Sequence, residues 1–136
     1  MNYSFRKKNK IVKYIVIHYT GMKNLQSAYS RLNNINSNVS CHYLISRIGI
    51  IYNLLSPNLK SWHAGKSQWR NIQNLNDYSV GIELENKGHD YGYKDFTNNQ
   101  YTSLKKLINF LNKNFQIKHQ DIIFHSDISP NRKRDP

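Results

Sequence analysis

Two histidines, His18 and His125, each end a strongly apolar segment of the sequence, residues 11–19 and 121–125. An imidazole at such a place either pairs within the core or faces a site. Taken singly, each is more typical of a paired core histidine, but together they indicate two rings brought side by side on neighbouring strands. Neutral imidazoles together with a carboxylate are a common zinc ligand set, in which a catalytic site leaves the fourth position to water.

The carboxylate for such a site has two candidates in the same stretch, Asp127 and Asp135. Asp127 follows His125 by only two residues, which is awkward geometry for binding one ion together. Asp135 lies ten residues on, far enough for the chain to turn back. The spacing therefore favours Asp135.

The other histidines have simpler explanations. His89 and His119 lie in polar surroundings and are typical of surface residues. His42 begins a predicted hairpin strand, where a structural role is the simpler one. His63, in Ser-Trp-His-Ala-Gly, lies in a long loop and is as well placed to line a site as to be incidental.

Two charged groups also have alternative explanations. Glu83 and Glu85 alternate along a predicted strand and could form its solvated face. The run 132–134 (Arg-Lys-Arg) could be a solvated basic tail.

The elements that position these residues follow from periodicity. Residues 11–19 predict a buried strand, residues 24–35 a short and poorly capped helix, and residues 41–46 and 50–55 a hairpin with Gly49 in its turn. Residues 56–77 predict a long irregular loop, 78–86 an alternating strand with Val80, Ile82 and Leu84 on one face, and 121–125 a further strand. Residues 126–136 predict only loop.

The clearest predicted helix follows Thr97. Thr97 and Gln100 have the spacing of a capping box, in which each side chain bonds the other residue's backbone N–H. Apolar residues then recur at intervals of three and four, as on one face of a helix, at Tyr101, Leu104, Leu107, Ile108, Leu111 and Phe115.

Length and composition bound the fold. A chain of 136 residues with 38% hydrophobic residues fits one folded domain. Strands that alternate with helices, plus a hairpin, predict the α/β class: one mixed central β-sheet flanked by helices. We expect a basic N-terminal arm over residues 1–10 and the domain over 11–136. No apolar run approaches the ~20 residues of a membrane span, and one cysteine excludes an internal disulfide.

The charge is 20 Lys+Arg against 8 Asp+Glu, a net +12. Such an excess is compatible with nucleic-acid binding, yet a bias toward Asn, Lys, Ile and Tyr accounts for it equally well. No zinc-finger spacing or RNA-binding signature is present, and we expect no nucleic-acid partner.

Five segments of the chain carry a recognisable pattern in a fixed order. They are Val-Ile-His-Tyr-Thr-Gly (16–21), Cys-His-Tyr-Leu-Ile (41–45), Trp-His-Ala-Gly (62–65), Tyr-Ser-Val-Gly-Ile-Glu-Leu-Glu-Asn (78–86) and His-Ser-Asp-Ile-Ser-Pro-Asn-Arg-Lys-Arg-Asp-Pro (125–136). Together they resemble the zinc-dependent N-acetylmuramoyl-L-alanine amidases of the type-2 family, which share a fold with the peptidoglycan recognition proteins. The sequence of residues 62–86 is more similar to the envelope-anchored branch of Gram-negative bacteria than to the cytoplasmic recycling amidases.

The resemblance implies roles for particular residues. His18, His125 and Asp135 match the ligands of one Zn²⁺ per chain. Glu83 matches the acid that handles the proton of the attacking water, in preference to Glu85, and Lys133 matches the lysine that steadies the oxyanion.

The resemblance also implies a substrate groove. His63 and Trp62 match residues that line it, and we include His42 as a third candidate substrate-binding residue.

The implied activity is zinc-dependent hydrolysis of the amide bond between N-acetylmuramic acid and L-alanine in peptidoglycan or muropeptides, by a monomer. The alternatives are a peptidoglycan-binding module without catalysis and a basic nucleic-acid-binding domain.

The basic N-terminus does not resemble a signal peptide. The sequence as given therefore favours a cytoplasmic location; the alternative is the periplasm or cell envelope, if the native gene carries an export signal. Family members normally continue past Asp-Pro, so the resemblance implies a domain truncated at Pro136, where a frayed end would hold zinc more weakly.

Overall fold

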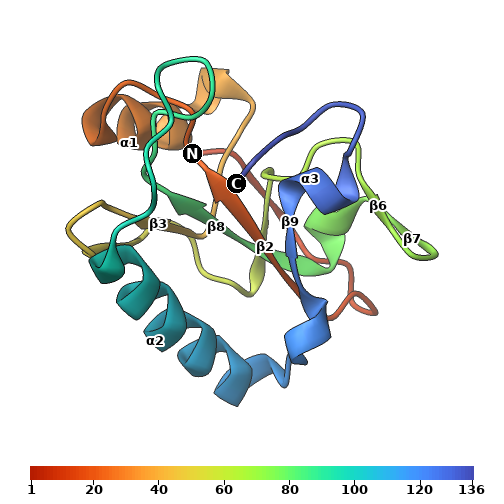
Figure 1. Ribbon diagram of the computed structural model, residues 1–136. Helices are drawn as coiled ribbons and strands as arrows, with labels where there is room; N and C mark the ends of the chain where they lie inside the picture. Colours follow the sequence, from red (N-terminus) through yellow and green to blue (C-terminus); the bar gives the residue numbers. More distant parts are fainter.

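The computed structural model describes residues 1–136, and its central feature is a five-stranded sheet flanked by helices (Figure 1). The elements in chain order are β1 (Tyr3–Phe5), β2 (Tyr14–Tyr19), α1 (Leu25–Asn33), η1 (Ile35–Ser37), β3 (Tyr43–Ile45), β4 (Ile51–Asn53), β5 (Leu59–Ser61), β6 (Gln68–Trp69), β7 (Ile72–Gln73), η2 (Leu75–Asp77), β8 (Ser79–Leu84), α2 (Asn98–Phe115), η3 (His119–Asp121), β9 (Ile122–Phe124) and α3 (His125–Ile128), where η marks a short 3-10 helix.

The central sheet has the strand order β4-β3-β8-β2-β9. Strands β3, β8, β2 and β9 are parallel, and β4 pairs antiparallel with β3 at one edge. The carboxyl ends of parallel strands lie at the same edge of a sheet, where such folds place their sites. The predicted mixed α/β sheet is confirmed.

Strand periodicity assigns side chains to the two faces of this sheet, because successive residues point to opposite faces. On β8, Val80, Ile82 and Leu84 pack in the core beneath α2, together with Ile15 and Ile17 of β2 and Leu107 and Leu111 of the helix. Their neighbours on the same strands, His18 and Glu83, therefore point to the opposite face. The predicted alternation over 78–86 is confirmed.

Helix α2 covers one face of the sheet (Figure 1). The expected capping box is present, with Thr97 Oγ1 accepting from Gln100 N and Gln100 Oε1 accepting from Thr97 N, both at 3.1 Å. The predicted apolar stripe is buried or half-buried except at Tyr101, which is exposed and packs edge-on against Phe96.

The opposite face is covered by α1, α3 and the segment between β5 and β8. Leu32 of α1 packs against Leu44 of β3, while Ile128 of α3 packs with Val16 of β2 and Leu75. Helix α1 is better capped than its sequence indicated, since Asn24 Oδ1 accepts from Ser27 N at 2.9 Å. The hairpin is as predicted, and Gly49 in its turn has a φ of 87°.

Two predictions of irregular loop were incomplete. Residues 56–77 contain β5, β6, β7 and η2, strands of two or three residues that are too short to show periodicity. Residues 126–136 contribute to α3, so His125 begins a helix instead of ending a strand. That helix is supported by Asp127 Oδ2, which accepts from Phe124 N at 2.8 Å.

The first ten residues, expected to form an arm, are packed on the domain. Strand β1 pairs antiparallel with β5. The Arg6 guanidinium donates to four backbone carbonyls, those of Pro57, Asn76, Asp77 and Ser79.

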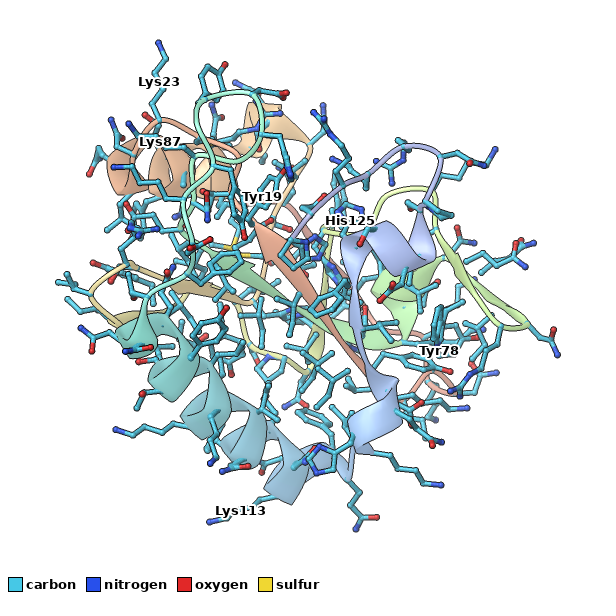
Figure 2. All side chains as sticks on the ribbon, in the orientation of Figure 1. Tyr19, Lys23, Tyr78, Lys87, Lys113 and His125 are labelled. Carbon is cyan, nitrogen blue, oxygen red and sulfur yellow. The ribbon has the colours of Figure 1, made fainter.

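Most of the lysines are exposed and come from separate segments of the chain, Lys87 among them. Figure 2 shows Lys23 and Lys113 projecting outward at two distant places on the molecule. None of the helices combines the length and the hydropathy that crossing a bilayer requires.

Candidate metal centre and active site

His18, His125 and Asp135 meet at the carboxyl end of the parallel strands. His18 lies on β2, His125 starts α3 directly after β9, and Asp135 returns to them because its carbonyl accepts from Ser126 N at 2.9 Å. All three residues are buried, and one ligand atom from each lies within 4.8 Å of the others. The spacing argument that preferred Asp135 to Asp127 therefore agrees with the structure.

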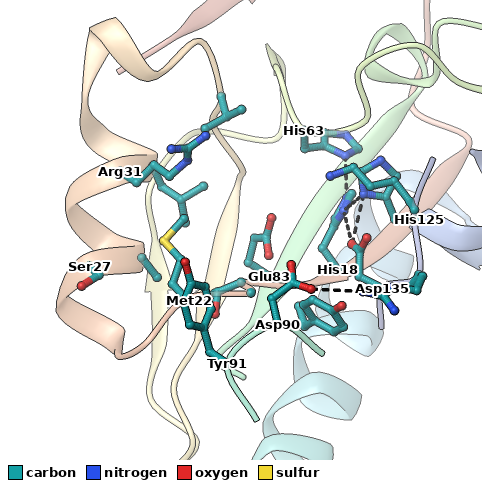
Figure 3. A pocket seen from close by; sticks show the side chains of 18 of the residues that line it. His18, Met22, Ser27, Arg31, His63, Glu83, Asp90, Tyr91, His125 and Asp135 are labelled. Carbon is teal, nitrogen blue, oxygen red and sulfur yellow. Dashed lines mark hydrogen bonds and ion pairs between the residues drawn. The ribbon is translucent and has the colours of Figure 1, made fainter. Parts of the chain in front are cut away.

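The three ligand atoms face one another directly (Figure 3). The two Nδ1 atoms of His18 and His125 are 2.8 Å apart, and Asp135 Oδ2 lies 3.3 Å from the first and 3.0 Å from the second. His125 Nε2 lies 3.1 Å from the Ala64 carbonyl, which can only accept, so the proton of a neutral His125 is on Nε2. Lone pairs and a carboxylate oxygen thus converge on one point, and a single cation there would satisfy all three.

The electrostatics of the cluster suit a cation. Burial, followed by the charge of His125, lowers the pKa of His18 to about 4, although Asp135 opposes the shift, so its imidazole is neutral at pH 7. Burial opposes ionisation of Asp135, but its contacts with the two histidines outweigh burial and hold its pKa below the usual range. Neutral imidazoles and an ionised carboxylate are the forms that bind zinc.

Glu83 adds a carboxylate to the same pocket. It pairs in register with His18 on the adjacent strand and points to the same face of the sheet. Its Oε2 is buried without a hydrogen-bond partner. Burial, followed by the negative charge of Asp135, raises the pKa of Glu83 well above its usual value, although Lys133 opposes the shift. A carboxyl group in such a place has the chemistry of a general acid and base.

Glu85, the competing acid of the same motif, is already bound elsewhere. Its Oε2 accepts from Arg47 N at 2.8 Å, and Glu85 does not line the pocket. The structure therefore separates two acids that their shared alternation had placed on one face.

The pocket has a volume of about 650 Å³, within the usual range for small-ligand sites. His18, His63, His125 and Asp135 form one wall, and Arg31 on α1 lies across from them (Figure 3). The lining includes five cationic side chains and three acidic ones; the cations are Lys23, Arg31, Arg132, Lys133 and Arg134.

Lys133 and His63 reach this pocket, whereas Trp62 and His42 do not line it. Trp62 Nε1 donates to Ser4 Oγ at 3.0 Å, so its indole ring is directed toward β1. His42 is fully buried, and both its ring nitrogens are bonded within the domain. These placements give no support to Trp62 or His42 as substrate-binding residues.

Three residues that shape the site had no individual role assigned from the sequence. Asn76 Oδ1 accepts from both His63 N and Ala64 N, at 3.1 and 2.8 Å. Arg132 Nη2 donates to the Ala64 carbonyl at 2.9 Å, which gives Arg132 a structural contact that a solvated tail would lack. Ser79 Oγ lies 3.0 Å from His63 Nε2. Ser79 and Arg132 fall within motifs of the resemblance, whereas Asn76 lies in the predicted loop, where a polar residue carries no spacing signal.

Comparison with known proteins agrees with this geometry. The sequence profile described as N-acetylmuramoyl-L-alanine amidase matches residues 7–136. The chain is 35% identical over 137 residues to the N-acetylmuramoyl-L-alanine amidase AmiD of Escherichia coli, covering 92% of this chain and 49% of that protein. It is 41% identical over 99 residues to the 1,6-anhydro-N-acetylmuramyl-L-alanine amidase AmpD of Haemophilus influenzae, covering 72% of this chain and 52% of that protein.

Solved structures agree as well. The E. coli AmiD complex superposes with a TM-score of 0.83 at 34% identity, covering 92% of this chain and 52% of that one. AmpDh3 from Pseudomonas aeruginosa gives 0.84 at 30% identity, covering 92% and 55%. The chain spans about half the length of the curated relatives it matches. It belongs to the type-2 N-acetylmuramoyl-L-alanine amidase family, on the branch that contains AmiD and AmpD.

Proposed function

We propose that this chain hydrolyses the amide bond between the lactyl group of N-acetylmuramic acid and L-alanine, in peptidoglycan or its fragments. The observation that carries the proposal is Glu83, a buried carboxyl group with an unpartnered oxygen in the same pocket as three converging ligand atoms. A binding module has no use for an unpaired buried acid, which costs stability.

We assign one zinc ion per chain to His18, His125 and Asp135. The donor set of two imidazole nitrogens and one carboxylate oxygen fits a catalytic zinc site with one position left open. Zinc bound there would supply Lewis-acid activation of water and of the scissile carbonyl.

Glu83 moves the proton. Its carboxylate takes a proton from the attacking water while the water oxygen bonds to the lactyl carbonyl carbon. When the bond from that carbon to the L-alanine nitrogen breaks, Glu83 gives the proton to the departing amine. One residue can serve both steps because its carboxyl group lies in the same pocket as the three ligand atoms and its Oε2 has no other partner.

Lys133 stabilises the negative charge that develops on the carbonyl oxygen. Its ammonium group lines the pocket and lies close enough to act on the pKa of both Glu83 and His18. A donor aimed at a developing oxyanion is worth about 3–4 kcal/mol.

Two observations support a substrate class: the charge of the pocket lining and the ligands of the relatives. Arg31 of α1 and Lys23, just before that helix, line the pocket, and their positive charges would attract the carboxylates of a stem peptide. The AmiD structure holds anhydro-N-acetylmuramic acid-L-Ala-D-gamma-Glu-L-Lys, and the AmpDh3 structure holds an anhydromuramic pentapeptide. We propose muropeptides of this kind as substrates, with no substrate contact from His42 or Trp62.

The test is release of L-Ala-peptide from N-acetylmuramyl-tripeptide, in its 1,6-anhydro and reducing forms. We expect release that stops with a zinc chelator and returns when zinc is added. Glu83→Gln should reduce kcat by about 10²–10⁴-fold with zinc still bound, whereas Glu85→Gln serves as the matched control and should stay near the parent rate.

Two outcomes would overturn the proposal. Binding of the muropeptide without release would establish a binding module instead. Release that is unaffected by both the chelator and Glu83→Gln would place the chemistry elsewhere in the molecule.

A further inference from the structure

His63 packs directly on β8, at the one residue of that strand without a side chain. A Cβ built on Gly81 would lie 2.4 Å from His63 Cγ, closer than any real contact allows. The ring is therefore seated on the backbone of the sheet, behind His18, and only 8% of the residue is exposed.

A chain of hydrogen bonds runs through this ring, and its direction can be read from one end. Ser79 Oγ lies 2.5 Å from the Leu75 carbonyl, which can only accept, so the single hydroxyl hydrogen of Ser79 is used there. Ser79 Oγ must then accept from His63 Nε2, at 3.0 Å. A neutral His63 thus keeps a bare Nδ1.

The direction carries through to the metal centre. His63 Nδ1 lies 2.9 Å from His18 Nε2, and with Nδ1 bare the hydrogen of this bond belongs to His18 Nε2. The other nitrogen of His18, Nδ1, is then free of a proton and faces His125 Nδ1 and Asp135 Oδ2. This is the tautomer that can bind a metal through Nδ1.

The same short segment of chain sets the second imidazole. The carbonyl of Ala64, the next residue, accepts from His125 Nε2 and directs that ring's Nδ1 to the same point. Asn76 holds the backbone N–H groups of His63 and Ala64 together. Two adjacent residues therefore fix both histidines, one by its side chain and the other by its carbonyl.

We propose that His63, backed by Ser79, is a positioning residue that fixes His18 as the Nε2–H tautomer and so prepares its Nδ1 for zinc. This inference deepens the proposed function and rests on it for the identity of the metal, and it replaces the substrate contact expected for His63. Hydrogen-bonded partners behind metal ligands typically contribute 10–100-fold to metal affinity.

The experiment compares His63→Leu with His63→Asn, two side chains of similar size and branching. Asn can keep an acceptor toward His18 Nε2, and Leu cannot. We expect His63→Leu to weaken zinc binding by about 10–100-fold in competition with a chromophoric chelator, and His63→Asn to recover much of the loss.

A second readout needs neither zinc nor substrate. Long-range ¹H–¹⁵N spectra of the metal-free chain report which ring nitrogen carries the proton. We expect His18 to be the Nε2–H tautomer in the parent and in His63→Asn. In His63→Leu it should convert toward Nδ1–H, because the acceptors that remain for its ring, Asp135 Oδ2 and the bare Nδ1 of His125, both lie beside His18 Nδ1.

Zinc affinity in His63→Leu within about twofold of the parent, or an unchanged His18 tautomer, would overturn the inference. If His63→Leu does not fold, Ser79→Ala takes its place, since it removes only the hydroxyl that orients His63; a parent-like tautomer and affinity there would count against the proposal equally. Both readouts are independent of amide hydrolysis, so an inactive chain with the expected tautomer would refute the proposed function and leave this inference standing.

Discussion

His42 lies on the same side of this sheet as the pair His18 and His125, but its ring nitrogens have different kinds of partner. His42 is fully buried, with Nδ1 accepting from Gly81 N at 2.9 Å and Nε2 donating to the Leu59 carbonyl at 3.0 Å. His18 and His125 are equally buried, but each has one nitrogen held by a neighbour and the other directed at Lewis-basic atoms.

Neither burial nor pKa separates His18 from His42. Burial lowers the pKa of both to about 4. The difference lies in whether the hydrogen-bonding groups are paired. The two ring nitrogens of His42 each have a complementary donor or acceptor. In the cluster with Asp135, by contrast, the facing atoms of His18, His125 and Asp135 are all electron-pair donors, which a cation would bind. A buried histidine is therefore assigned to function or structure by its hydrogen-bond inventory.

The largest effect that this comparison predicts is for Asp135→Ala. Removal of the carboxylate leaves two imidazoles as ligands, and we expect the loss of stable zinc binding and a fall in amidase rate of at least about 10³-fold, because activation of water near neutral pH is lost. Metal analysis of the dialysed protein, together with the release assay, measures both.

Asp127→Ala is the matched control for that experiment. Asp127 is the other carboxylate near His125, but its Oδ2 accepts from Phe124 N at the start of α3. We expect the variant to keep its zinc and lose only some stability. Loss of zinc in Asp127→Ala with retention in Asp135→Ala would reverse the ligand assignment.

A smaller effect on rate is expected for Lys133→Met. The substitution removes the cation and retains most of the volume, so kcat should fall by about 10²–10³-fold while zinc affinity changes little. An unchanged kcat with weakened zinc binding would instead place Lys133 among the groups that support the metal.

The sequence predicted those parts of the molecule in which periodicity is long enough to be detected. The alternation of 78–86 and the apolar stripe after Thr97 assign the sheet faces correctly, and with them the side on which Glu83 lies. The cluster was predicted as a pair of histidines at the ends of apolar segments plus a carboxylate ten residues further on. Such a prediction is possible because the end of an apolar segment, and a spacing long enough for a loop to turn back, are both visible in the local sequence.

What the sequence could not predict depends on contacts between distant residues. His42 and His63 both lie in apolar or loop surroundings, and only tertiary structure shows that one is fully bonded internally while the other contacts His18. Glu83 and Glu85 share an alternation, but the backbone N–H of Arg47, 38 residues away from Glu85, separates them. The strands of residues 56–77 are too short for any period.

The smallest expected effect tests the structural side of the comparison, at His42. Burial is the largest cause that lowers its pKa to about 4, with the charge of nearby Arg6 acting in the same direction and the Leu59 carbonyl opposing. Its ring also lies 6.0 Å from that of His63. The folded state therefore prefers neutral His42, whereas an unfolded chain takes up the proton near pH 6.5.

The contribution of neutral His42 to the free energy of unfolding is complete above about pH 6.5. It is lost as pH falls toward 4, because the unfolded state binds more protons than the folded state between these two values. At pH 5 the loss due to this group is about 2 kcal/mol. His42→Asn, which does not titrate, should be less stable than the parent at pH 7. Its free energy of unfolding, from urea titrations at each pH, should then fall less steeply below pH 6.5, by up to one proton per chain. An unchanged slope would mean that His42 takes up a proton in the folded state as readily as in the unfolded chain. The complementary bonding that distinguishes His42 from the proposed metal ligands would then be refuted.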